Sequence, residues 1–193
     1  MNIFKFAAFL LLSNFLSAQD LIITKNDTIS AVEGSIHVAL SGKKLMYINA
    51  KTSEKTKVKI KDVISATFKD RRFVTYQIKN KVRGGFLLTE NKDAKLIVLS
   101  SKRSVNKGGF DVPYMRYELS IVRNSDTKQL VFTDVNNKRN IAFRAEATQL
   151  IQGNFADCET IITRLKSFES DKKDIENPAI TGLLENPYFT ACN

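Results

Sequence analysis

The sequence predicts a mainly β protein of the α+β class: an antiparallel β-sandwich or barrel-like roll of about ten strands, followed by two or three C-terminal helices. Apolar and polar residues alternate through most of residues 20–133, which is the period of a half-buried strand. Short clusters of Gly, Asn, Asp and Ser interrupt the alternation, as turns do. After Asn137 the apolar residues recur at helical spacing instead.

The first segment, residues 1–18, predicts a signal peptide. Lys5 supplies the positive charge, Phe6 to Leu12 is an unbroken apolar run, and small residues precede a cut near Ala18 or Gln19. The run is shorter than the about 20 residues that span a bilayer. An uncleaved anchor and a buried N-terminal helix are the other interpretations. We expect an exported protein, periplasmic or secreted, with no membrane span in the remaining chain.

The next segment, residues 19–135, predicts the antiparallel β-rich domain. It opens with a strand at residues 21–23, and the turn residues Lys25-Asn26-Asp27 follow. Ile36, Val38 and Leu40 then alternate with smaller or polar residues. The other predicted strands lie near residues 28–33, 45–48, 58–60, 63–68, 74–78, 83–89, 96–99, 115–121 and 130–132.

Three features inside this region carry more specific predictions. The pair Gly84-Gly85 indicates a bulge or a close approach of two backbones. The continuous apolar run from Leu96 to Leu99 is typical of a strand buried on both faces. Residues 100–109 are polar, cationic and end in glycine, and we expect a long loop there.

The last segment, residues 136–193, predicts helices packed on the same domain. Its first two helices each show one apolar face. The residues of these faces are Phe143, Ala147, Leu150 and Ile151, and then Cys158, Ile161, Ile162, Leu165 and Phe168. Asn154 or Asp157 is the predicted cap of the second helix. A third helix is expected to begin at Asn177-Pro178 and to end near Asn186.

The chain contains two cysteines, Cys158 and Cys192. An even pair in an exported protein is expected to oxidise, so we predict a disulfide between them. A free buried thiol and an intermolecular bridge are the alternatives. The pair lacks C-x-x-C spacing, so a redox-active role is not expected.

The formal charge of +10 is concentrated in one region. Thirteen cations lie between Lys43 and Arg83, against three carboxylates. The predicted polyanion-binding residues are Lys55, Lys57, Lys59, Lys61, Arg71 and Arg72. The four lysines alternate, so a strand would carry them on one face, about 6.6 Å from each to the next. The alternative is a solvated face, or an edge strand charged against aggregation.

Catalytic, cofactor and metal sites are not expected from the sequence. His37 is the only histidine, and no G-x-S-x-G motif is present. Asp134, Asp157 and Asp174 lack the spacing of a metal-binding loop. A hydrolase that uses only carboxylates remains an alternative.

Several segments carry a family resemblance. They are the leader ending Leu-Ser-Ala-Gln-Asp, residues 21–29 (LIITKNDTI), residues 58–68 (VKIKDVISATF), residues 155–158 (FADC) and the cysteine close to the C-terminus. With these, the chain resembles a broad group of small uncharacterised exported β-rich proteins of Bacteroidota-type Gram-negative bacteria. The resemblance implies a β-rich fold with C-terminal helices and an extracytoplasmic location, and it implies no activity.

These observations favour a non-enzymatic binding or cell-envelope-associated protein without a cofactor. Its ligand would be an envelope polyanion, engaged through the basic strand, or another envelope protein. Nucleic acid is not an expected partner, because the predicted leader takes the chain out of the cytoplasm. The alternatives are a barrel-like carrier of a small apolar ligand and a carboxylate-based hydrolase.

Overall fold

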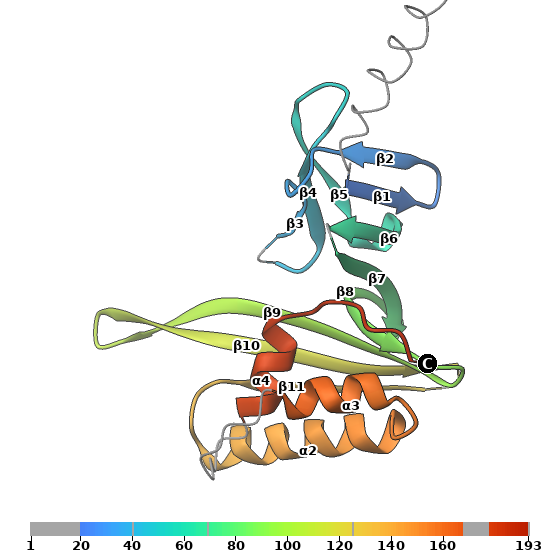
Figure 1. Cartoon of the computed structure of the whole chain (residues 1–193). Coiled ribbons are helices and arrows are strands. Elements are labelled where there is room, and N and C mark those ends of the chain that lie inside the picture. The colour runs from blue at the N-terminus through green and yellow to red at the C-terminus, as the bar shows by residue number, and fades with distance from the viewer. Residues whose placement is uncertain (1–19, 40, 69, 125, 168–177, 193) are drawn as a thin grey trace, which may run out of the picture. The chain divides into compact units, whose positions relative to one another are not determined.

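A computed structural model describes residues 20–39, 41–68, 70–124, 126–167 and 178–192 (Figure 1). The predicted signal peptide, its cut site, Phe168 and the Asn177 cap lie outside these residues. The chain forms two compact units, and the second begins at Asp70. The alternation in the sequence does not indicate this division of the β-strands. We call them unit 1 and unit 2.

Unit 1 contains two three-stranded antiparallel arrangements. The first has the order β2-β1-β6, and the second has the order β3-β4-β5. Their strands are β1 (Asp20–Thr24), β2 (Thr28–Ala31), β3 (His37–Val38), β4 (Lys44–Ile48), β5 (Lys55–Lys59) and β6 (Val63–Phe68). An isolated bridge between Ala31 and Asn49 connects the two arrangements. Ile22 and Leu45 are fully buried and form part of the core.

Unit 2 is an antiparallel sheet in the order β7-β8-β9-β10-β11, with helices on one of its faces (Figure 1). The strands are β7 (Arg71–Ile78), β8 (Lys81–Glu90), β9 (Ala94–Lys107), β10 (Phe110–Arg123) and β11 (Thr127–Thr133). The helices are α2 (Lys138–Asn154), α3 (Glu159–Lys166) and α4 (Pro178–Glu185). None of the helices in the described part of the chain has the length and apolar character that crossing a membrane requires.

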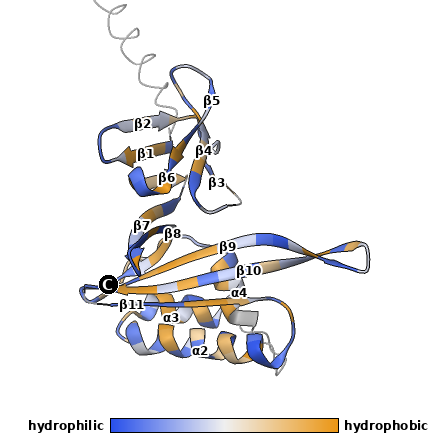
Figure 2. Cartoon of the chain, turned by 180° about the vertical axis from the view of Figure 1, so that it is seen from behind, coloured by the Kyte–Doolittle hydropathy of each residue, from blue (hydrophilic) through white to orange (hydrophobic). Residues whose placement is uncertain are grey.

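The core of unit 2 lies between the sheet and the helices, where the apolar colours of Figure 2 gather. On β10, Tyr117, Leu119 and Ile121 alternate and are buried against this core. On α2, Ala147 and Ile151 are one turn apart and fully buried. The apolar residues of the strand, two positions apart, and those of the helix, one turn apart, therefore pack into the same core between sheet and helices.

The predicted fold class is confirmed: the chain is mainly β and antiparallel, with helices at its C-terminal end. The described strands do not close a barrel. The sheet of unit 2 is nevertheless curled, so that its first and last strands come together: the Thr127 hydroxyl at the start of β11 donates to the Gln77 carbonyl near the end of β7, over 3.2 Å. The barrel-like roll is thus an open, curled sheet.

The predicted long loop at residues 100–109 is wrong. β9 and β10 continue through it as a hairpin, paired from Ala94 opposite Arg123 to Lys107 opposite Phe110. The turn uses Gly108 and Gly109, whose φ angles of +59° and +89° favour glycine. The distal residues 104–113 are all exposed, so burial does not impose the alternation from which strands are predicted.

The close approach predicted at Gly84-Gly85 is confirmed at Gly85. A Cβ on Gly85 would lie 2.7 Å from Ile97 Cγ2 and 2.8 Å from the Val98 carbonyl oxygen. The pairing of β8 with β9 shifts register between Leu87 and Thr89. The missing side chain therefore permits β8 to lie tightly against β9.

The predicted cap of the second helix is wrong. Cys158 is the N-cap of α3, without a capping hydrogen bond from its side chain. Asn154 is the last residue of α2. Its side-chain amide nitrogen donates to the Leu150 carbonyl over 2.7 Å, and its side-chain Oδ1 accepts from the Arg123 guanidinium. These bonds occupy the side chain that a cap would require. α4 begins at Pro178, as expected from the proline.

Candidate functional site

The lysine row lies on β5, at the edge of the β3-β4-β5 arrangement in unit 1. Residues directly opposite one another in a sheet share a face, and alternate residues of a strand share it too. Lys55 is opposite Ile48, Lys57 is opposite Met46, and Lys59 is opposite Lys44. We call this side the basic face. Its members are His37, Lys44, Met46, Ile48, Lys55, Lys57 and Lys59.

The other side of the same strands fixes this orientation. Leu45 and Tyr47 of β4 point away from the basic face and are buried. Val58 of β5, opposite Leu45, is half-buried. A slip of one residue would expose these apolar side chains and bury lysines, so the register is strongly determined.

The lysines of the basic face have no ion-pair partner among the described residues. Lys44 and Lys59 are direct cross-strand partners, an arrangement in which like charges repel. The basic face contains no acidic residue. Among the described residues, the ion pairs are Lys95–Glu90, Arg116–Glu118 and Lys128–Glu146, so none involves the lysines of this face. An anion bound there would relieve the repulsion.

His37 adds a polar group to the basic face without completing a catalytic set. It is exposed, and its Nδ1 lies 3.1 Å from the Ser35 carbonyl oxygen. Its cross-strand partner is Met46. The neighbours on its own face are apolar or cationic, so none of them carries a hydroxyl or thiol that the imidazole could activate.

Lys61 does not continue the lysine row. A 3-10 helix (Ile60–Asp62) follows Lys59 and ends the alternation. Ile60 is buried, with 2% of its surface exposed, and its N–H donates to the Lys43 carbonyl over 3.0 Å. Burial of Ile60 therefore turns the chain out of the strand, and the prediction of four aligned lysines is wrong by one residue.

Arg71 and Arg72 lie on β7, in unit 2, and contact aromatic rings. The Arg72 guanidinium carbon is 3.9 Å from the centroid of the Phe189 ring. The Arg71 carbon is 5.2 Å from the Tyr188 ring and 5.9 Å from the Phe86 ring. These cation–π contacts hold the C-terminal tail, residues 186–192, against the sheet. The structure thus gives both arginines a packing role that the sequence does not predict.

The C-terminal tail is also held at its end by the cysteine pair. Cys158 Sγ and Cys192 Sγ are 2.06 Å apart, at disulfide distance, and this is the pairing predicted from the sequence. The Thr190 N–H donates to the Leu88 carbonyl over 2.7 Å, and the Thr89 hydroxyl donates to the Thr190 carbonyl over 2.6 Å. The tail is therefore tied to both β8 and α3.

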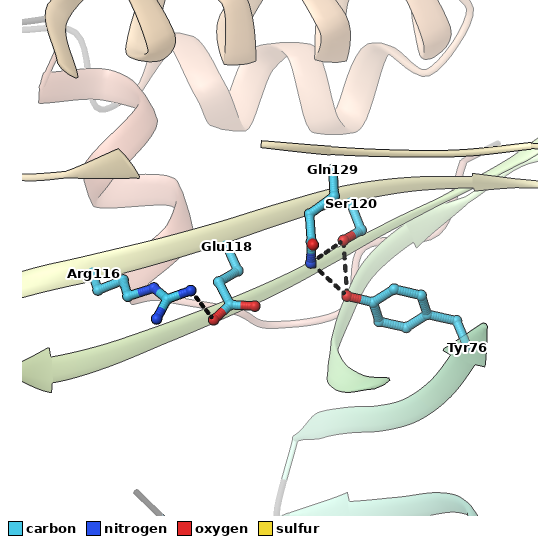
Figure 3. A network of polar contacts seen from close by, with 5 residues as sticks. All are labelled: Tyr76, Arg116, Glu118, Ser120 and Gln129. Atoms are coloured by element: carbon cyan, nitrogen blue, oxygen red, sulfur yellow. Dashed lines mark hydrogen bonds and ion pairs between the residues drawn. The ribbon is translucent and has the colours of Figure 1, made fainter. Parts of the chain in front are cut away.

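A polar network lies on the face of the unit 2 sheet turned away from the helices (Figure 3). The Tyr76 hydroxyl is 2.8 Å from Ser120 Oγ. The Gln129 amide donates to the Tyr76 oxygen over 3.3 Å and to Ser120 Oγ over 3.4 Å. Beside it, Arg116 and Glu118 form an ion pair of 3.2 Å. These residues come from three strands, and no motif in the sequence indicates them.

The chemistry of this network is that of a packed polar layer. Burial raises the pKa of Tyr76, which keeps its phenol protonated at neutral pH. Ser120 is 1% exposed, and among the described residues its hydroxyl contacts this phenol and the Gln129 amide. Neither group is a base that could activate a serine nucleophile.

Two further observations on the described residues bear on small ligands and metals. One hollow of about 60 Å³ is lined by Ile121, Arg123, Asp126, Lys128, Leu150 and Asn154. Small-molecule pockets enclose about 300 Å³ or more, so this hollow does not support the carrier hypothesis. Within the described part of the chain, no group of three or more His, Cys, Asp or Glu could hold a metal ion.

Comparison of the chain with models of protein families, with curated proteins and with solved structures finds no match in any of the three.

Proposed function

We propose that this is an exported, non-enzymatic, cell-envelope-associated protein that engages a polyanion through the basic face. The observation that carries the proposal is the direct cross-strand opposition of Lys44 and Lys59, continued along β5 by Lys57 and Lys55. A bound anion would convert a repulsive arrangement into an attractive one. Among the described residues, no carboxylate forms an ion pair with these lysines.

The side chains favour a flexible, repeating anion over a single small one. Successive lysines on β5 are about 6.6 Å apart, so a ligand must present several negative groups to engage all of them. Lysine acts as a compact point charge and lacks the bidentate fork of arginine. The face is therefore suited to phosphates or carboxylates along a polymer or on a surface, such as lipopolysaccharide phosphate or an acidic glycan.

The export part of the proposal is supported by the leader-like residues 1–18 and by the cysteine pair. Disulfides persist in oxidising compartments, and Cys158 and Cys192 are at disulfide distance. Periplasmic or secreted placement would expose the basic face to envelope polyanions and separate it from nucleic acid. The resemblance to small exported β-rich proteins supports the same location.

The competing interpretation is an edge strand charged against aggregation, because β5 is the edge of its arrangement. Retention on dextran sulfate separates the two. We expect the Lys55→Gln, Lys57→Gln, Lys59→Gln variant of the mature chain to elute at clearly lower salt, with a salt dependence weaker by about three counterions.

The matched control removes three exposed lysines elsewhere, through Lys92→Gln, Lys138→Gln and Lys166→Gln. Both variants change the net charge equally. If the control elutes as early as the β5 variant, retention reflects net charge alone and the proposed site is wrong. If the β5 variant instead keeps its retention and aggregates, the edge-strand interpretation is correct.

A further inference from the structure

The distal ends of β9 and β10 form a two-stranded arm, residues 102–115, which extends beyond the helices of unit 2 (Figure 1). Every residue from 104 to 113 is exposed. An isolated two-stranded ribbon is at best marginally stable in water. An arm of this kind therefore gains from contact with something outside the unit.

The arm is amphipathic. Val105 is opposite Val112, and Phe110 is opposite Lys107, so all four side chains lie on one face. Their apolar members are exposed by 44%, 40% and 77% for Val105, Val112 and Phe110. Arg103 continues this face toward the sheet. The opposite face carries Lys102, Ser104, Asn106, Asp111, Pro113 and Met115.

The residues at the tip of the arm favour a lipid surface over a protein as its binding partner. A stable interface with a second copy or another protein buries about 800 Å² on each side, far more than three side chains supply. A lipid interface requires no complementary shape, and one aromatic ring with adjacent cations is suited to it. Lys107 provides such a cation on the apolar face, and Asp111 is on the other face.

We propose that the tip of the arm inserts into an anionic lipid surface. The Phe110 ring enters the boundary between headgroups and acyl chains, with Val105 and Val112 behind it. Lys107, the cross-strand partner of Phe110, then lies at the level of the lipid phosphates. The four residue-to-residue steps from Phe110 to Tyr114 span about 13 Å, which is enough to place the ring in the interface while the sheet stays in water.

This inference is independent of the basic face, because it concerns unit 2 and depends on apolar insertion. The chain contains no tryptophan, so a Phe110→Trp variant carries a single reporter. With the mature chain we expect its emission to shift to the blue on adding vesicles of phosphatidylethanolamine and phosphatidylglycerol, and to be quenched by brominated acyl chains. Emission that stays unshifted and unquenched would overturn the proposal.

Vesicle co-sedimentation provides the second measurement. Phe110→Ser should weaken binding to the phosphatidylglycerol vesicles by at least about tenfold, whereas Val135→Ser, which removes another exposed valine, should not. Lys107→Gln should reduce the preference over phosphatidylcholine vesicles. The three-lysine β5 variant should sediment as the parent does. Equal loss in Val135→Ser, or a parent dimer that Phe110→Ser dissociates, would contradict insertion of the tip.

Discussion

Replacement of Gly85 by alanine places a methyl group where unit 2 leaves no room for it. The new carbon would be 2.7 Å from Ile97 Cγ2, 2.8 Å from the Val98 carbonyl oxygen and 3.3 Å from the Val98 carbonyl carbon. A rotation of Ile97 can relieve the first contact, but the other two involve backbone. Val98 is paired with Leu119 of β10, so moving its carbonyl strains the centre of the sheet.

We therefore expect Gly85→Ala to lower the free energy of unfolding by about 2–3 kcal/mol, in the upper part of the range for overpacking. Urea denaturation followed by circular dichroism measures it, with an unchanged slope showing that the unfolded state is the same. Gly153→Ala is the matched control, because a Cβ there meets nothing within 4 Å and the residue lies in α2. That variant should gain up to about 1 kcal/mol. Stability of Gly85→Ala equal to the parent would refute the close approach of β8 and β9.

Three further predictions concern unit 2. Cys158→Ala with Cys192→Ala should cost about 4 kcal/mol in urea unfolding, since the bridge spans a sequence separation of 34, and unchanged stability would contradict the pairing. Burial raises the pKa of Tyr76 above its ordinary 10.0, so its contribution to stability is complete below that pH and is lost as pH rises through the folded pKa. Spectrophotometric titration should show one fewer late-ionising phenol in Tyr76→Phe; an unchanged profile would disprove the shift. Arg144 is 1% exposed and donates to the Thr133 carbonyl and to Asn136 Oδ1, both over 3.0 Å. Arg144→Ala should therefore lower the free energy of unfolding by about 3 kcal/mol. A melting temperature equal to that of the parent would show that these bonds are dispensable.

The elements that the sequence predicts well are those with one buried face. Tyr117, Leu119 and Ile121 alternate because the helices cover one side of β10, and Ala147 and Ile151 recur because α2 packs there. The strands of the arm are not predicted from the sequence for the same physical reason, because residues exposed on both faces do not alternate between apolar and polar. The division into two units is not predicted either, because the strands of both units show the same alternation of apolar and polar residues.

The candidate site was predictable to the extent that it is local. Three lysines at alternate positions of one strand indicate a cationic row, whereas the opposition of Lys44 and Lys59 depends on register. Buried Ile60 removes Lys61 from the row, which a pattern of alternate lysines does not indicate. Arg72 meets Phe189 only through the fold, as do Tyr76 and Ser120, so no short motif could indicate these contacts.

The most direct test of the basic face is a residue-resolved NMR titration of the mature chain with a sulfated or phosphorylated polymer. The proposed function predicts that amide shifts concentrate on Lys44, Lys55, Lys57 and Lys59, and that added salt reverses them. Shifts confined to unit 2, or spread evenly over all exposed lysines, would contradict it.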